Sequence, residues 1–175
     1  MSSCLNVAFS APGVLPWYGI RTKSNQEKTT ATILAAKGYE QYLPMYQARR
    51  HWTDRTVDVS LPLFPGYVFC RFDAKRRLPI VSTPGVVCII GFGAEPAPIP
   101  DAEVEAIQNV LSSGFSPEPC PYLQEGQRIR VKSGPLKGLE GILQKKKSEY
   151  RLVVSVAMLQ RSICVEIDRD HIATA

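Results

Sequence analysis

The sequence predicts an α+β protein in two parts, an antiparallel sheet flanked by helices and then a small β-barrel. Residues 17–113 follow the order strand, helix, strand, strand, short helix, strand, helix, the pattern of helices packed on one antiparallel sheet. Residues 115–122 contain three prolines, which favour an extended linker without helix or sheet capacity. Residues 127–167 hold four short alternating segments, which favour a small closed barrel without exposed edges.

The length and composition agree with two small globular domains. A chain of 175 residues with 45% hydrophobic and 21% charged residues is ordinary for a soluble protein. We place the boundary at the prolines. We therefore predict a disordered N-terminus at residues 1–14, a mixed domain at 15–114, a linker at 115–123 and a barrel domain at 124–175.

The mixed domain opens with a strand and a helix. Residues 17–23 (WYGIRTK) alternate like a strand, and residues 24–27 (SNQE) form a capping-box signature. The helix that follows extends to Lys37 and stops at Gly38, a natural C-cap. Residues 39–50 then form a second strand, interrupted by a proline.

A hairpin follows, with a polar tip at residues 51–60 and a returning strand in residues 61–72 (LPLFPGYVFCRF). Alternation places Tyr67, Phe69 and Arg71 on one face of that strand. The default interpretation of so apolar a segment is a strand buried on both faces. The alternative is an exposed aromatic patch, which often marks a partner surface.

The remainder of the mixed domain contains a short helix, an apolar strand and a longer helix. Basic residues 75–77 precede the short helix at 78–81, and residues 86–92 (VVCIIGF) form the strand. The second long helix covers residues 101–113, carries an apolar stripe and ends at Gly114.

The barrel domain reads as four strands separated by turns. We expect these strands at residues 127–132, 138–145, 150–156 and 162–167.

The charge and the apolar segments restrict the class of protein. The net charge of +5 is spread over both halves, so nucleic-acid contact is expected to be local rather than the whole activity. No apolar run approaches membrane-spanning length, and the N-terminus has no basic start. We expect a soluble cytoplasmic protein that makes no membrane contact.

The sequence offers no catalytic site, metal site or cofactor site. The five cysteines are scattered without zinc-ligand spacing, and we interpret Cys70 and Cys88 as core thiols in apolar strands. The two histidines, His51 and His171, have no acid or nucleophile partner in motif spacing. We therefore expect a protein that is not an enzyme.

Taken together, these motifs resemble a known family. The segments WYGIRTK, LPLFPGYVFCRFD and GFGAEPAPIP, with GQRIRVKSGPLKGLEGIL after the linker, resemble the NusG family of bacterial transcription elongation factors over about residues 17–172. The last segment is similar to a KOW motif. PLFPGYVF, RRHWTDR and GFGAEPAPIP resemble specialised paralogues of the RfaH and UpxY type more than housekeeping NusG. The resemblance implies an NGN-like domain, a linker and an SH3-like barrel.

The resemblance also implies a partner, since the NGN domain of this family docks on RNA polymerase. A hydrophobic depression grips the clamp helices of the β′ subunit, and residues 75–77 lie where the family approaches the β subunit or upstream DNA. A solvated helix end is the plainer interpretation of those three basic residues. The residues at matching positions of the depression are Phe64, Tyr67 and Phe69, with Trp17 and Ile90 as neighbours.

Specialised members of the family further contact the non-template DNA strand. Lys23, Arg50 and Arg55 occupy matching positions, and Arg49 and His51 are adjacent additions. Cations suit phosphates and flat groups suit bases, which agrees with a DNA-binding role. The alternative is a solvated hairpin without a ligand.

The KOW loop has its own interpretation. Gly134 and Gly138 can take positive φ and Pro135 stiffens the turn between Lys132 and Lys137, so the loop is expected to be architectural. The resemblance implies a monomer whose barrel recruits either Rho or a small-subunit ribosomal protein. Some specialised members refold this domain into a helical hairpin that masks the polymerase site. Here the β-branched run at residues 152–156 and the glycines at 134, 138 and 141 favour a barrel, and fold switching is the alternative. The alternative function is a ribosome-associated, RNA-binding KOW protein.

Overall fold

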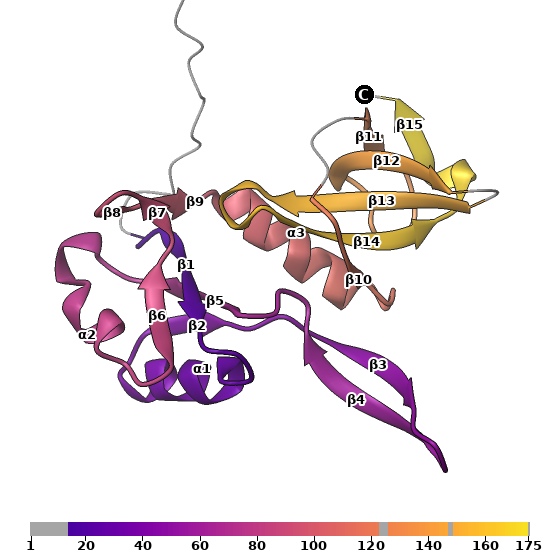
Figure 1. Cartoon of the computed structure of the whole chain (residues 1–175). Coiled ribbons are helices and arrows are strands. Elements are labelled where there is room, and N and C mark those ends of the chain that lie inside the picture. The colour runs from indigo at the N-terminus through magenta and orange to yellow at the C-terminus, as the bar shows by residue number, and fades with distance from the viewer. Residues whose placement is uncertain (1–13, 123–125, 147–148, 175) are drawn as a thin grey trace, which may run out of the picture.

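A computed structural model describes residues 14–122, 126–146 and 149–174. Nearly all of the predicted disordered N-terminus, residues 1–13, lies outside these ranges. The described residues form an α+β arrangement in which a sheet with helices lies below a second, barrel-like sheet (Figure 1). The predicted fold class is confirmed.

The N-terminal sheet is antiparallel, with strand order β2-β5-β1-β6, and β9 also pairs with β1. Its strands are β1 (Trp17–Thr22), β2 (Glu40–Tyr42), β5 (Tyr67–Arg71), β6 (Val86–Ile89) and β9 (Pro98–Ile99). The central pair places Gly19 opposite Phe69 and Ile20 opposite Val68. Side chains therefore alternate between two faces of this sheet.

One face of the sheet packs against helices α1 (Glu27–Ala36) and α2 (Leu78–Val81). Apolar residues of this face meet the inner stripes of both helices in one buried cluster. Its members are Tyr18, Ile20, Ala31, Leu34, Val68, Cys70, Phe72 and Ile80. This face therefore forms the core between the sheet and its two helices.

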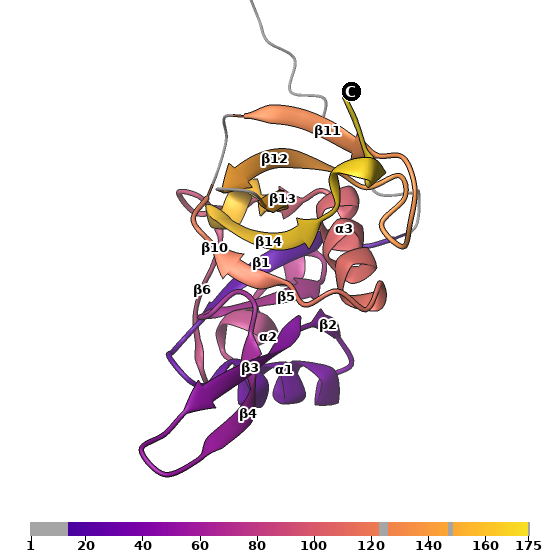
Figure 2. The same cartoon turned by 90° about the vertical axis from the view of Figure 1, so that its right-hand side faces the viewer.

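The other face carries Trp17, Gly19, Tyr67, Phe69 and Arg71, and we call it the aromatic face. Helix α3 (Asp101–Ser112) and the C-terminal barrel lie on this side, opposite α1 (Figures 1 and 2). Strand β5 is therefore buried on both faces, as the default interpretation of its pattern predicted. An openly displayed aromatic patch is not what the structure contains, since Phe69 is 0% exposed.

The helix ends test two predictions of local structure. The predicted capping box is wrong, because α1 begins after Gln26 without a side-chain cap. The buried Glu27 carboxylate instead accepts a hydrogen bond of 2.8 Å from the backbone N–H of Gly66. The C-cap prediction is confirmed, since the helix stops before Gly38, whose φ of +86° is in the left-handed region.

The β3–β4 hairpin projects from the sheet as a separate two-stranded ribbon (Figure 1). Its strands are β3 (Met45–His51) and β4 (Thr56–Pro62). The predicted polar tip at residues 51–60 is shorter than expected, because most of these residues are paired and only residues 52–55 make the turn. A smaller hairpin pairs β7 (Gly91–Phe92) with β8 (Glu95–Pro96).

The C-terminal sheet has the antiparallel order β10-β14-β13-β12-β11-β15. Its strands are β10 (Glu118–Cys120), β11 (Gln127–Val131), β12 (Glu140–Lys146), β13 (Glu149–Val156), β14 (Arg161–Ile167) and β15 (Ile172–Thr174). Two short 3₁₀ turns, η2 (Ala157–Leu159) and η3 (Arg169–His171), lie on either side of β14, and a third, η1 (Ala74–Arg76), precedes α2 in the N-terminal part.

Two features of this sheet differ from expectation. The proline-rich segment supplies β10, which pairs with β14, so it is not a linker without sheet capacity. The barrel was also expected to be closed, yet within the described residues β10 and β15 end the pairing order without pairing to each other. The prolines correctly predicted extended backbone, which is also the conformation that a strand needs.

The Glu27 contact generates a stability prediction. We expect Glu27→Ala to lower the free energy of unfolding by about 1–3 kcal/mol, because it leaves the Gly66 N–H without its acceptor. Glu27→Gln keeps an acceptor oxygen and should cost less. Denaturant unfolding followed by circular dichroism measures both. The control is Glu105→Ala, an exposed carboxylate on α3, and an equal effect of the two alanine variants would contradict this role.

Candidate functional site

Aromatic rings on the aromatic face pack in a cluster around Phe69. The Phe64 ring meets Phe69 edge-on, with centroids 5.5 Å apart, and the Tyr42 ring lies 6.2 Å away on the other side. The centroids of the Trp17 and Tyr42 rings are 6.5 Å apart. Burial raises the pKa of Tyr42 to about 12. Edge-on and tilted arrangements at these distances are favoured geometries of aromatic pairs.

Arg71 connects this cluster to helix α3. Its guanidinium carbon lies 4.7 Å from the centre of the Trp17 ring, and its Nη2 donates to Asp101 at 3.0 Å. Asp101 begins α3, where a carboxylate also complements the helix dipole. Arg71 of β5 therefore links the N-terminal sheet to helix α3. Its side chain is 16% exposed.

The five predicted docking residues come together on this face. Phe64, Phe69 and Trp17 are buried at 1%, 0% and 3% exposure. Tyr67 and Ile90 are half-buried and pack against the same cluster.

The cover of this cluster comes from the far end of the chain. A single buried cluster joins the aromatic rings to Val104, Ile107 and Val110 of α3 and to the interior of the barrel. The barrel members are Ile129, Val131, Leu136, Leu139, Leu152, Val154, Val156, Leu159, Ile163, Val165 and Ile167. A Cβ placed on Gly19 would lie 2.6 Å from Cδ2 of Leu159. The turn that carries Leu159 therefore packs directly on the bare backbone of β1.

Glu103 is a second point of contact between α3 and the barrel. Its carboxylate accepts a hydrogen bond from the backbone N–H of Ala157 in η2, and burial raises its pKa to about 7 against the opposing effect of that hydrogen bond. Its Oε2 is buried without a hydrogen-bond partner among the described residues. This carboxylate is poorly accommodated when it is charged.

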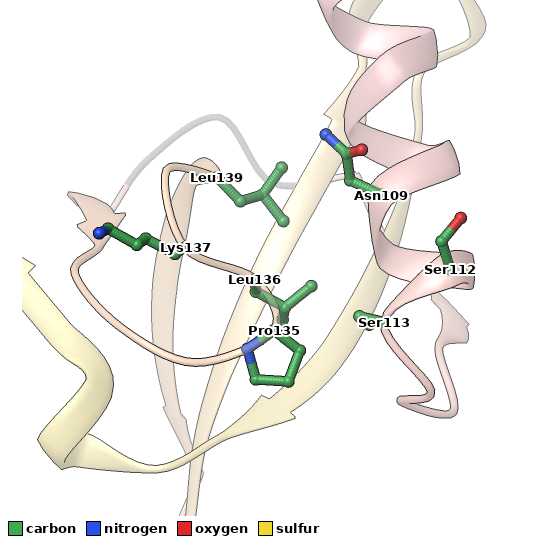
Figure 3. Close-up of a pocket in the computed structure, with 7 residues that line it drawn as sticks. All are labelled: Asn109, Ser112, Ser113, Pro135, Leu136, Lys137 and Leu139. Atoms are coloured by element: carbon green, nitrogen blue, oxygen red, sulfur yellow. The ribbon is translucent and has the colours of Figure 1, made fainter.

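The KOW loop faces the end of α3 across a small cavity of about 240 Å³ (Figure 3). Its lining combines one helix and one loop: Asn109, Ser112, Ser113, Pro135, Leu136, Lys137 and Leu139. Ligand pockets are usually about 300–1,000 Å³, so this space is better described as a gap in packing. Gly134 and Gly138 have φ of +83° and +87°, which supports the architectural role predicted for the loop.

The basic hairpin gathers four of the five predicted DNA-binding residues near one tip. Arg49 pairs with Asp58 at 3.3 Å, and Nδ1 of His51 is hydrogen-bonded to Thr56 at 2.9 Å. Arg50 and Arg55 are exposed at this tip. Figure 2 shows the ribbon extending away from the barrel.

Two residues modify this view of the hairpin. Trp52, in the turn, is 63% exposed and supplies a flat apolar surface beside the arginines. Lys23 lies elsewhere, after β1, with its backbone N–H bonded to the carbonyl of Gly85. The structure therefore does not bring Lys23 into the hairpin tip.

Sequence reasoning missed a second exposed apolar area around α2. Leu78 and Phe92 are 76% and 77% exposed, and the elements that carry them are joined by a 2.8 Å hydrogen bond from Arg77 to the carbonyl of Ala94. Cys88, predicted as a core thiol, is exposed, whereas Cys70 is buried. Cys88 is exposed because β6 is an edge strand with an irregular register against β1.

Within residues 14–122, 126–146 and 149–174, every helix is too short or too polar to span a membrane. The same ranges contain no group of three His, Cys, Asp or Glu side chains that could hold a metal ion.

A family model described as "Transcription termination factor nusG" matches residues 15–108, more than half of the chain and almost the whole of the domain that carries the aromatic face. The chain belongs to the NusG family. The assignment rests on the N-terminal sheet, helices α1 and α2 and the β3–β4 hairpin, which lie within the matched range.

Individual relatives agree with this family. The transcription termination/antitermination protein NusG of Escherichia coli K12 is 37% identical over 118 residues, which span 64% of this chain and 65% of that protein. The Yersinia pestis protein is 39% identical over 60% of this chain and 61% of its own length. The chain thus aligns with slightly less than two thirds of these relatives. NusG of Helicobacter pylori 26695 is 25% identical over 88% of this chain and 95% of its own.

The fold also has a solved counterpart. The structure entitled "Domain interaction in Thermotoga maritima NusG" aligns with a TM-score of 0.54 at 20% identity, covering 91% of this chain and 96% of that one. At this identity the likeness concerns the fold alone. It extends across both domains, beyond the range that the family model matches.

The raised pKa of Glu103 generates a pH prediction. The folded chain holds the proton more tightly than the unfolded one, so this group's stabilising contribution is complete below its ordinary value of 4.5 and is lost as pH rises through about 7. We expect the difference in melting temperature between Glu103→Gln and the unchanged chain to grow in favour of Glu103→Gln from pH 5 to pH 8.

Thermal unfolding followed by circular dichroism at each pH measures this difference. Glu105→Gln, on the exposed side of the same helix, is the matched control and should show no such trend. A constant offset for Glu103→Gln would mean that its carboxyl does not titrate in this range.

Proposed function

We propose that this chain is a transcription elongation and antitermination factor that binds RNA polymerase through its aromatic face. The observation that carries the proposal is the concentration of Trp17, Phe64, Tyr67 and Phe69 on one side of the sheet, inside the range that the NusG family model matches. The printed names of the relatives, transcription termination/antitermination proteins, support the same function.

The physical properties of this face suit a helical partner such as the clamp helices of the β′ subunit. Rigid rings bury much apolar area and lose little rotamer entropy on binding. A factor that holds the polymerase clamp in its closed state shifts the enzyme away from pausing, because a ligand favours the state that it binds better. This activity requires no chemistry by the factor itself, so we propose a protein that is not an enzyme.

The hairpin is proposed as a contact to the non-template DNA strand. Exposed Arg50 and Arg55 can neutralise phosphates, and exposed Trp52 can stack on a base. Arg49 forms an exposed ion pair with Asp58. Breaking such a surface pair costs little free energy, so Arg49 is also available to DNA.

The barrel is proposed to recruit a second partner in the cytoplasm, either Rho or a small-subunit ribosomal protein. The motifs PLFPGYVF and RRHWTDR favour an operon-specific role of the RfaH or UpxY type. A ribosome-associated RNA-binding protein is the other candidate, but it leaves the match of residues 15–108 to the NusG family model without an explanation.

Loss of Tyr67 tests polymerase docking. We expect Tyr67→Ala to weaken binding to core RNA polymerase about 30-fold, the effect of removing one hot-spot aromatic. Tyr67 is suited to this test because it is half-buried, whereas Phe69 is wholly buried and its loss threatens folding. Biolayer interferometry with core enzyme measures the affinity.

The matched control is Tyr39→Ala, a half-buried tyrosine that packs against the opposite, helix-covered face. Equal affinity of the folded Tyr67→Ala and Tyr39→Ala proteins would remove the aromatic face as the docking site. Binding to ribosomes with no binding to polymerase would favour the RNA-binding alternative.

The hairpin has an independent test. We expect Trp52→Ala to lower photo-crosslinking of the non-template strand in a transcription bubble about 10-fold, and Arg50→Ala with Arg55→Ala to lower it comparably. The matched control for charge is Arg128→Ala with Arg161→Ala, two exposed arginines of the barrel. Hairpin variants that crosslink as well as this control would identify the tip as a solvated turn.

A further inference from the structure

We propose that Cys120 and Cys164 form a reversible intramolecular disulfide, made by a peroxide, that fixes strand β10 to the barrel. The two cysteines lie on adjacent strands, β10 and β14, where the proline-rich segment joins the C-terminal sheet (Figure 2). This modification site involves neither the aromatic face nor the hairpin, so it goes beyond the function proposed for them.

The strand register places the two cysteine side chains on one face of the sheet. Cys120 pairs with Ser162, and Cys164 pairs with Glu118. Paired residues of antiparallel strands share a face, and so do residues two positions apart along one strand. Cys120 and Cys164 are therefore diagonal neighbours on the same face.

Contact between the two thiols is evident in the acid–base behaviour of Cys120. Burial is the main cause that raises the pKa of Cys120 to about 12, and the Cys164 thiol adds to the shift through its charge and a side-chain hydrogen bond. The neighbouring Arg151 opposes the shift. Cys120 is thus protonated at neutral pH and reacts slowly, so the pair stays reduced until an oxidant persists.

Arg151 provides the positive charge that the buried thiol needs in order to react. Its Nη1 donates to Sγ of Cys164 at 4.0 Å, and its Nη2 donates to Glu166 at 3.4 Å. Its Nε is buried without a hydrogen-bond partner among the described residues. A guanidinium with an unused donor favours the thiolate form of a cysteine beside it. We therefore assign Cys164 as the thiol that completes the disulfide.

The reaction has two steps, one for each thiol. Cys120 is partly exposed and Cys164 is only 5% exposed, so a peroxide reaches Cys120 first. The Cys120 thiolate attacks one oxygen of hydrogen peroxide and the O–O bond breaks, which gives a sulfenic acid and, after proton transfer, water. The Cys164 thiolate then attacks the Cys120 sulfur, and the S–S bond forms as the S–O bond breaks and a second water leaves. The two thiols lose two electrons and two protons, and one peroxide is reduced to two water molecules.

The geometry of the pair makes the disulfide reversible. A disulfide needs Cβ atoms about 3.5–4.5 Å apart, closer than diagonal neighbours usually are. Strand β10 has to shift along β14, which it can do because it has only three residues and Pro119 has no N–H to donate. A disulfide that holds a displaced strand is strained, and strained disulfides are the ones that cellular thiols reduce.

The consequence of oxidation is a fixed, short connection between helix α3 and the barrel. While β10 is paired, residues 113–117 connect α3 to the C-terminal sheet, whereas after detachment of β10 the connection would be residues 113–126. The added residues, 118–126, extend by at most roughly 30 Å. The disulfide removes this added length, so it limits how far a partner of the barrel can lie from the N-terminal sheet.

Peroxide treatment of the full-length chain tests the pair. The starting chain carries Cys4→Ser and Cys88→Ser, which remove two other thiols. We expect mass spectrometry of proteolytic peptides to show Cys120 joined to Cys164 within one chain, with the loss of two hydrogens, and reduced glutathione to restore both thiols. The matched controls are Cys120→Ala and Cys164→Ala, each of which removes one partner of the pair.

Hydrogen exchange and thermal unfolding measure the effect on β10. We expect the amides of Glu118 and Cys120 to exchange at least about 10-fold more slowly in the oxidised chain than in the reduced chain. The melting temperature should rise by about 5–10 °C on oxidation. The oxidised and reduced forms have the same sequence, so this comparison does not depend on the folding of a variant.

Each outcome supports or overturns the proposal. Peroxide that leaves Cys120 and Cys164 unjoined, or joins either of them to another cysteine, contradicts the pair. A disulfide that reduced glutathione leaves intact and only dithiothreitol opens is structural, which overturns its reversibility. Equal exchange of the Glu118 and Cys120 amides in both forms overturns the fixing of β10. None of these results changes the test of polymerase docking by Tyr67→Ala.

Discussion

The structure depends on the need to bury the aromatic face. A four-aromatic cluster cannot face water without cost, since each fully buried ring or large aliphatic side chain contributes about 1.5–3 kcal/mol. Helices α1 and α2 cover only the opposite face of the sheet. The aromatic face is completed by α3 and by the C-terminal sheet, so a single apolar cluster extends from β1 to β14. The two domains are thereby joined through the face proposed for polymerase.

Gly19 is the local constraint that makes this possible. A strand interior normally disfavours glycine, and a glycine there often marks a close approach of another backbone or a ligand. Here Leu159 occupies the space above Gly19. The side chain of Ile90 forms the edge of that space, with its Cγ1 3.3 Å from a Cβ placed on Gly19. Any larger residue would push the barrel turn away. The depression is thus a property of β1 itself, available either to the barrel or to a partner.

Local patterns in the sequence predicted most helices and strands. The predictions that were wrong concern residues whose partners lie far away in the sequence. Alternation correctly separated Tyr67 and Phe69 from Val68, because period two depends only on the strand. It could not identify the cover, since Leu159 lies some ninety residues further along the chain. Glu27 was misread for a similar reason. Its capping-box position is local, but its actual partner, the Gly66 N–H, comes from a distant turn. Proline spacing predicted extended backbone at β10 and gave no information on pairing.

The hairpin and the aromatic face differ in how their residues relate to folding, and this difference bears on function. Arg50, Trp52 and Arg55 are exposed, so folding does not explain them, whereas the proposed DNA contact would use all three. Phe69 and Trp17 are buried beneath α3 and the barrel, so folding alone explains them in this arrangement. Their proposed function in docking therefore needs a second arrangement, in which the free energy of the interdomain contact is exchanged for that of docking.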